Sequence, residues 1–185
     1  MYDKIIKIET KKELDIYMNP QRQRLLKCME LLGKPVTPKQ LSEKLDISAS
    51  SVTLHLKKLM TLGLVELDHT EMIHGICARF YKKIPVQVQL YSGKKDALQP
   101  EKELLLDYMM TDTWNGFRTY LAHAEDSDND HKETGDLING ILYLNDHDVQ
   151  ELKQFLQEFQ EKHSQPKDGA SAWESAHIFY PRENI

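Results

Sequence analysis

The chain has 185 residues, of which 40% are hydrophobic and 29% charged, and its formal net charge is −5. This balance is typical of a soluble globular protein and excludes a largely disordered chain. No apolar run reaches the ~18 residues that a membrane span needs. The amino terminus lacks the pattern of a secretory signal, and only two cysteines are present. We therefore expect a cytoplasmic protein with no disulfide framework and no membrane partner.

The charges are divided unevenly between the two halves of the chain. Residues 1–85 hold 15 Lys+Arg and 10 Asp+Glu, a net charge of +5, whereas residues 86–185 hold 9 and 19, a net charge of −10. A basic half beside an acidic half predicts one module that faces a polyanion and a second that is held away from it. The expected domains are residues 1–85, a connector over 86–99 and a carboxy-terminal unit over 100–185.

Two helices are expected near the amino terminus, after a short strand or arm within residues 1–9. The first helix covers residues 11–17, and Asn19-Pro20 opens a second that runs to Leu32. Apolar residues at helical spacing predict a buried stripe on the second helix, made of Leu25, Leu26, Met29 and Leu32.

Residues 37–63 predict two short helices joined by a tight turn. Thr37 caps the first helix, with Pro38 at its first position, and Ser48 caps the second, which Gly63 ends. Val52, Leu56 and Leu59 form an apolar stripe along the second helix. Its opposite face is small, hydroxylated and basic, with no carboxylate from Ala49 to Leu62: Ser50, Leu54, Lys57 and Thr61. This face suits a helix that lies against a polyanion and approaches base edges, whereas the alternative is a helical hairpin without a ligand.

Two strands are predicted next, at residues 64–67 and 78–84, and together they would form a wing. Arg79, Lys82 and Lys83 on the return strand are expected to contact phosphates, but Asp68 and Glu71 would repel them, so groove insertion by the wing is not expected. The intervening loop also gathers potential metal ligands: Asp68, His69, His74 and Cys77. Their spacing matches no standard site, so we expect no metal here.

Three segments carry a resemblance to a known family: NPQRQRLL at 19–26, LSEKLDISASSVTLHLKKL at 41–59 and GLVE at 63–66. They resemble the winged helix-turn-helix of the ArsR type of bacterial transcription regulators, over about the first half of the chain. His55 stands where that family usually carries a histidine in its recognition helix. Metal-sensing members carry a Cys-x-Cys pair on the preceding helix, but the corresponding residues here, 40–45, include no cysteine.

The carboxy-terminal half predicts a small α/β unit. A long helix is expected from Pro100 to about Ala124, followed by an exposed loop over 125–136, a strand over 138–144, a helix over 147–163 and a last strand over 176–180. One side of the long helix presents an apolar seam, for which a second copy is the expected partner: Leu106, Met110, Trp114, Phe117 and Leu121. A helix that covers its own domain, or a small-molecule pocket lined by the aromatic residues, is the alternative.

The expected fold class is thus α+β, mainly helical, with a winged helix-turn-helix domain and a carboxy-terminal unit for dimerisation and sensing. The sequence lacks the motifs of phosphate-binding loops, nucleophile elbows and zinc peptidases, so we expect no enzyme and no cofactor. The predicted function is a homodimeric regulator that binds a palindromic operator in double-stranded DNA, with an unidentified small-molecule effector left open. The alternatives are a winged helix that binds an acidic protein or RNA, and a metal-responsive repressor. The predicted DNA contacts are Ser48, Ala49, Ser50, Ser51, Thr53, Leu54, Lys57, Lys58, Arg79 and Lys82.

Overall fold

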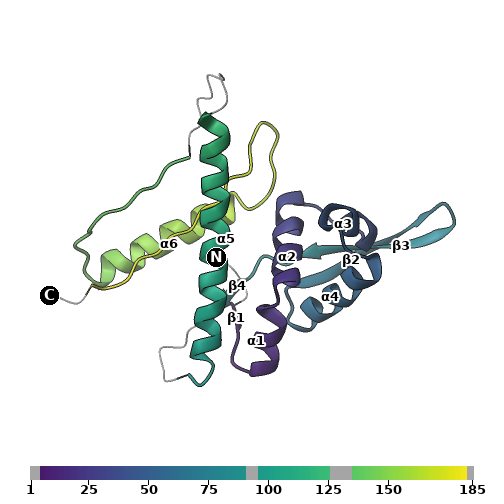
Figure 1. Ribbon diagram of the computed structural model, residues 1–185, viewed down its shortest axis with the longest axis horizontal. Coiled ribbons are helices and arrows are strands. Elements are labelled where there is room, and N and C mark those ends of the chain that lie inside the picture. Colours follow the sequence, from purple (N-terminus) through teal and green to yellow (C-terminus); the bar gives the residue numbers. More distant parts are fainter. Residues whose placement is uncertain (1–4, 91–95, 126–134, 183–185) are drawn as a thin grey trace.

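The computed structural model describes residues 5–90, 96–125 and 135–182, and these form the mainly helical α+β fold that the sequence predicts (Figure 1). In chain order the elements are β1 (Ile5–Lys7), α1 (Lys11–Tyr17), α2 (Pro20–Leu32), α3 (Pro38–Leu45), α4 (Ala49–Thr61), β2 (Val65–Ile73), β3 (Ile76–Lys83), β4 (Gln87–Gln89), α5 (Gln99–Glu125) and α6 (Asp146–Lys162). No described helix is long and apolar enough to cross a lipid bilayer.

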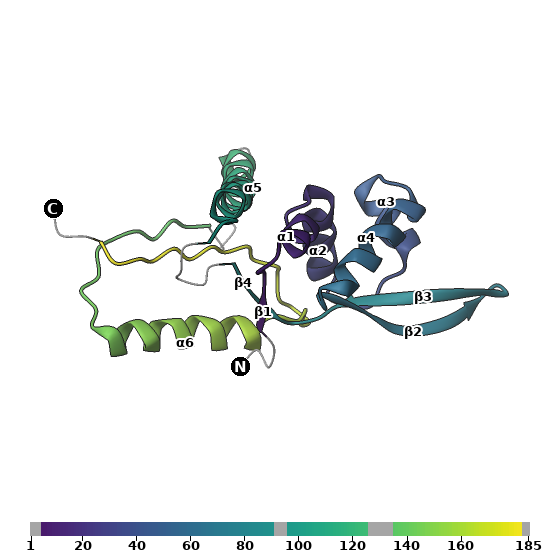
Figure 2. The same ribbon diagram turned by 90° about the horizontal axis from the view of Figure 1, so that it is seen from below.

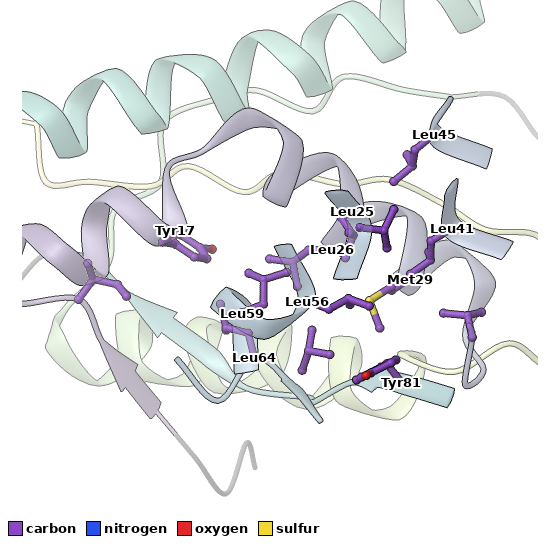
Figure 3. Packing of buried hydrophobic residues seen from close by; sticks show 14 of the residues in the cluster. Tyr17, Leu25, Leu26, Met29, Leu41, Leu45, Leu56, Leu59, Leu64 and Tyr81 are labelled. Carbon is purple, nitrogen blue, oxygen red and sulfur yellow. The ribbon is translucent and has the colours of Figure 1, made fainter. Parts of the chain in front are cut away.

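The core lies among α1 to α4 and the first residues of β2 (Figure 3). The predicted stripe of α4 is buried completely, since Val52, Leu56 and Leu59 each have 0% of their surface exposed. It packs with the predicted stripe of α2, of which Leu32 is only partly buried. The two apolar stripes thus fix the helices of the first half against each other.

Short polar residues set the helix boundaries where the sequence predicts them. The Asn19 side chain accepts a hydrogen bond from the Arg22 backbone N–H (3.2 Å), and Thr37 forms a reciprocal capping box with Gln40. Gly33 ends α2 in the left-handed conformation, with φ of 56°. These contacts satisfy backbone groups that helix ends leave free.

The connector contributes a strand that the sequence analysis did not predict. β4 pairs in parallel with β1, and the Ile8 N–H donates a further hydrogen bond to the Gln89 carbonyl at 3.2 Å. Val86, Val88 and Leu90 are partly buried against the core, so their alternation favours a strand with one apolar face. The chain therefore returns to its amino-terminal segment before α5 begins.

The wing is longer than predicted, because the expected loop is itself strand. β2 and β3 form an antiparallel hairpin whose turn consists of His74 and Gly75, with φ values of 50° and 80°. Two consecutive residues with positive φ are typical of a type I′ turn, whose twist matches that of the flanking strands. The hairpin extends well beyond the helices (Figures 1 and 2).

The carboxy-terminal half contains the two predicted helices, but the two predicted strands are wrong. Residues 138–144 and 176–180 form no strand, although they are extended and pass between α5 and α6 in Figure 2. Neither segment makes the backbone hydrogen bonds that define a ladder within the part of the chain described. Of the expected 125–136 loop, residues 126–134 lie outside the described residues. The half is joined to α2 by Lys27, whose Nζ lies 2.7 Å from Asp112 and 2.9 Å from Glu174.

Candidate nucleic-acid interface

The turn between α3 and α4 places the start of α4 at the surface. Asp46 ends α3 in the left-handed conformation (φ 54°), which short polar side chains tolerate better than most, and the Ile47 N–H donates to the Ser42 carbonyl. Ser48 then caps α4 by accepting a hydrogen bond from the Ser51 N–H at 3.1 Å. The turn and cap therefore aim the exposed amino-terminal end of α4 away from the core.

The outward face of α4 is the one that the sequence predicts. Ser50, Leu54 and Lys57 are exposed, and Leu54 keeps 58% of its surface in solvent although it is apolar. Thr53 is half-buried, and its hydroxyl donates to the Ala49 carbonyl at 2.8 Å. The Ser48 and Ser50 hydroxyls lie 3.0 Å apart. These hydroxyls are held in fixed positions and keep lone pairs that can accept hydrogen bonds from base amino groups.

The basic side chains of the candidate interface differ in whether carboxylates of the same chain pair with them. Lys57, Lys58 and Arg79 are exposed and make no ion pair with any described carboxylate. Lys82 instead lies 3.3 Å from Glu66 and 2.9 Å from Asp68. Lysines without a counterion are the better phosphate ligands, because contact with DNA neutralises a charge that the protein has left uncompensated.

Nearby carboxylates also form ion pairs with other basic residues at the base of the wing. Lys83 pairs with Glu30 at 2.7 Å, and hydrogen bonds from His69 and Lys82 lower the pKa of Asp68. Asp68 therefore stays ionised and keeps Lys82 engaged. Among the predicted phosphate contacts, the structure thus brings Lys57 and Lys58 together on α4 and places Lys82 in an ion-pair network, whereas Arg79 on β3 pairs with no described carboxylate.

His55 lies on the side of α4, half-buried next to the core. Its Nδ1 is buried and has no hydrogen-bond partner among the described residues. Burial and the nearby Arg22 guanidinium lower the pKa of His55, so the ring is neutral near pH 7. The neutral histidine thus adds no charge to the helix face.

Among the described residues, the four potential metal ligands of the wing are not brought together as a site. The His69 Nδ1 and the Asp68 carboxylate are hydrogen-bonded at 2.6 Å. His74 lies in the turn of the hairpin, and Cys77 lies opposite Met72 on the paired strand. The His69 ring stacks on Phe80, with centroids 4.4 Å apart. Extended hairpin geometry therefore spreads these ligands along the wing, and each has a structural role or is solvated.

A different set of potential ligands, which the sequence analysis did not single out, lies at the start of α6. The ligand atoms of His147, Asp148 and Glu151 lie within 4.8 Å of one another. Asp148 is already used in the capping box with Asn145, accepting the Asn145 N–H at 3.0 Å. A capping box of this kind is explained by the start of a helix, and the i, i+4 spacing alone brings the other two side chains together.

Comparison with known proteins assigns the helix-turn-helix. Residues 19–66, which contain α2, α3 and α4, match the family described as "Bacterial regulatory protein, arsR family". The match covers 48 of the 185 residues. No curated protein matches the sequence of the chain significantly.

Several solved structures are similar to the chain at low identity. They include AdcR, the adhesin competence repressor of Streptococcus pyogenes, with 13% identity over 81% of this chain and 83% of that chain and a TM-score of 0.34. ZitR of Lactococcus lactis shares 17% identity over 82% and 87%, with a TM-score of 0.31. A "possible transcriptional regulator" of Methanosarcina mazei shares 13% over 57% and 81%, with a TM-score of 0.33.

The matched segment coincides with the helices whose geometry has just been described. The capped turn, the buried stripe of α4, its carboxylate-free outer face and the hairpin that follows it are the parts of a winged helix-turn-helix. The resemblance found in the sequence is therefore confirmed over residues 19–66. Residues 19–66 of this chain thus match the helix-turn-helix of the family described as bacterial regulatory proteins of the arsR type.

Proposed function

We propose that this chain binds a palindromic operator as a homodimer, with α4 of each copy in the major groove of one half-site. The observation that carries the proposal is the outer face of α4, on which exposed lysines that pair with no described carboxylate follow a run of small hydroxylated residues. A two-fold dimer would space its recognition helices about one helical turn of DNA apart, ~34 Å, or a multiple of it.

The residues divide into two roles. Ser50, Ser51, Thr53 and Leu54 are proposed to contact base edges or thymine methyl groups, because they are small or apolar and lie on the outer face in the first half of α4. Lys57, Lys58 and Arg79 are proposed to contact phosphates, together with the backbone N–H groups that follow Ser48 and Ala49 at the start of the helix. Lys82 is proposed to contribute less, because its charge is shared with Glu66 and Asp68.

The proposed dimer contact is the apolar seam of α5. Met110, Trp114 and Leu121 are exposed by 38%, 49% and 41%, and Leu106 and Phe117 are half-buried. Trp114 and Phe117 lie with ring centroids 5.8 Å apart. We assign this surface to a second copy rather than to a small-molecule pocket, because the rings lie on an open helix face that extends over several turns.

The experiment that tests the function is selection of bound duplexes from a random DNA pool, followed by sequencing. An inverted repeat is expected. A single unrepeated motif would contradict the two-fold arrangement, and preferential binding of RNA or single strands would contradict major-groove recognition. The Thr53→Ala variant is expected to bind the selected operator more weakly and random duplexes equally well, because the change removes a hydroxyl and a methyl group but no charge.

A further inference from the structure

The part of the chain that follows the first turns of α5 has almost no interior of its own. No described residue between Leu106 and Arg182 is buried. Many large apolar side chains in this region are instead exposed, among them Ile138 (92%), Ile141 (62%), Leu142 (68%), Tyr143 (95%), Phe155 (60%), Phe159 (55%), Ile178 (67%) and Tyr180 (76%). Ordering a polypeptide requires buried apolar surface to offset the lost conformational entropy, so this region needs a covering partner.

The surface area of the whole chain leads to the same conclusion. The accessible surface is 14469 Å² for a mass of 21.6 kDa. A folded monomer of that mass exposes about 9,200 Å², which leaves an excess of about 5,300 Å². Even if the 21 residues outside the described ranges were counted as fully extended chain, they would account for only about 3,500 Å². The remaining excess of about 1,800 Å² lies within the range of surface that each copy of an obligate homodimer buries.

Two extended segments concentrate this exposed surface. Residues 137–144 (LINGILYL) and 176–180 (AHIFY) contain no Asp, Glu, Lys or Arg, although they lie in the strongly acidic half of the chain. The backbone groups of residues 138–144 make no hydrogen bond to any described residue. Native edge strands that stay uncovered are protected by charges or by proline within the strand. These two segments have no such protection over their length, as expected for strands that are covered in the assembly.

The covering surface lies next to the seam already assigned to the dimer. The Gly135 N–H donates to the Tyr120 hydroxyl at 3.1 Å, and the Thr113 hydroxyl donates to Glu174 at 3.0 Å. The residues that lead into the two extended segments therefore contact α5. In Figure 2 they run in the same direction between α5 and α6. A second copy that packs on the seam of α5 is thus brought next to these segments.

We propose that the second copy completes the carboxy-terminal unit by strand pairing. Residues 137–144 and 176–180 of one copy join those of the other in one intermolecular sheet, and α6 of each copy covers it with Phe155 and Phe159. The proposal rests on the homodimer of the proposed function and adds a contact distinct from the α5 seam. At a two-fold axis, a strand pairs with the same strand of the other copy in the antiparallel direction. We place residues 137–144 at this axis, in the centre of the sheet, because this segment is the longer and more exposed of the two.

The test compares full-length variants by sedimentation equilibrium. Ile141→Asp places a carboxylate from each copy at the proposed sheet, and it is expected to raise the dimer dissociation constant by roughly 30-fold or more. Ile76→Asp, at the exposed wing tip, is the matched control and is expected to leave the dissociation constant unchanged. Met110→Asp probes the α5 seam separately. If Ile141→Asp dimerises as tightly as the control while Met110→Asp dissociates, the intermolecular sheet is refuted and the proposed function stands.

Amide hydrogen exchange on the wild-type chain gives an independent test, which does not require that any variant folds. The amides of residues 138–144 are expected to be protected at high protein concentration and to lose protection on dilution, in step with dissociation of the dimer. Protection that persists in the monomer would mean that the strands pair within one chain, and it would refute the proposal. A wild-type chain that is monomeric at micromolar concentrations would refute the proposed homodimer as well.

Discussion

Replacing Lys57 by alanine tests whether the exposed face of α4 meets the DNA backbone. Lys57 is exposed, and no described carboxylate pairs with it. Each phosphate contact contributes about 0.9 to the slope of log affinity against log salt concentration, so a dimer that loses two contacts changes its slope by about 1.8. Between 50 and 200 mM salt the wild-type affinity should therefore fall about 12-fold further than that of the variant.

The assay is fluorescence anisotropy with a labelled duplex over a series of salt concentrations. The loss of affinity at low salt should be the same for the selected operator and for a random duplex, because phosphate contacts carry no sequence information. Folding stability should change by less than about 0.5 kcal/mol, as expected for an exposed substitution. Lys82→Ala is the matched control: it should change the slope less, because Glu66 and Asp68 already neutralise Lys82.

Two results would refute this reasoning in different ways. An unchanged slope for Lys57→Ala would show that this side chain releases no counterion and therefore does not contact a phosphate. A change of only about 0.9 would mean that one copy binds each site, which would contradict the homodimer while leaving the phosphate contact intact.

The remaining predictions concern stability and are measured by urea denaturation. Leu56→Ala should lower the free energy of unfolding by about 2–5 kcal/mol, because Leu56 is fully buried. Leu54→Ala should lower it much less, because 58% of the Leu54 surface is already exposed. The pKa of His55 in the folded chain lies below its ordinary value of 6.5, so the unfolded chain binds a proton at a higher pH than the folded chain does. The free energy of unfolding of the wild type should therefore fall as the pH drops from about 7.5 to 5.5. The His55→Gln variant should lose less stability over the same range, because it lacks this titrating group. Asp96→Asn should destabilise more than Lys102→Met, because it leaves the ammonium of Lys102, only 2% exposed, without its carboxylate partner.

The first half of the fold could be predicted because its signals are local and agree with one another. Asn19, Thr37 and Ser48 cap the helices that they precede, and Gly33 and Gly63 adopt the positive φ that ends a helix. The stripe of α4 is buried completely against α2 and α3. When capping and periodicity favour the same boundaries, the helix positions follow from the sequence alone.

The wing and β4 were predicted less well because strands depend on contacts that are distant in the sequence. The sequence predicts a loop for the polar residues of β2, whereas pairing with β3 holds them in a hairpin as far as Ile73. The signal that could have identified the turn is the His74-Gly75 pair, since a two-residue turn with positive φ favours glycine. For β4 the partner is β1, some 80 residues earlier, and only the alternation of residues 86–90 indicated a strand.

The missing strands of the carboxy-terminal half follow from the same principle, applied beyond one chain. A strand is stable only when its backbone groups are paired and one face is covered, and residues 138–144 have neither within the described chain. The sequence pattern of these residues nevertheless favours a strand, because it is mostly apolar, contains two Ile and two Leu, and is bounded by Asp136 and Asn145. Pattern and single-chain structure agree if the partner strand belongs to a second copy. On that view the recognition helices and the carboxy-terminal unit are linked, since the contact that completes the sheet also sets the spacing between the two copies of α4.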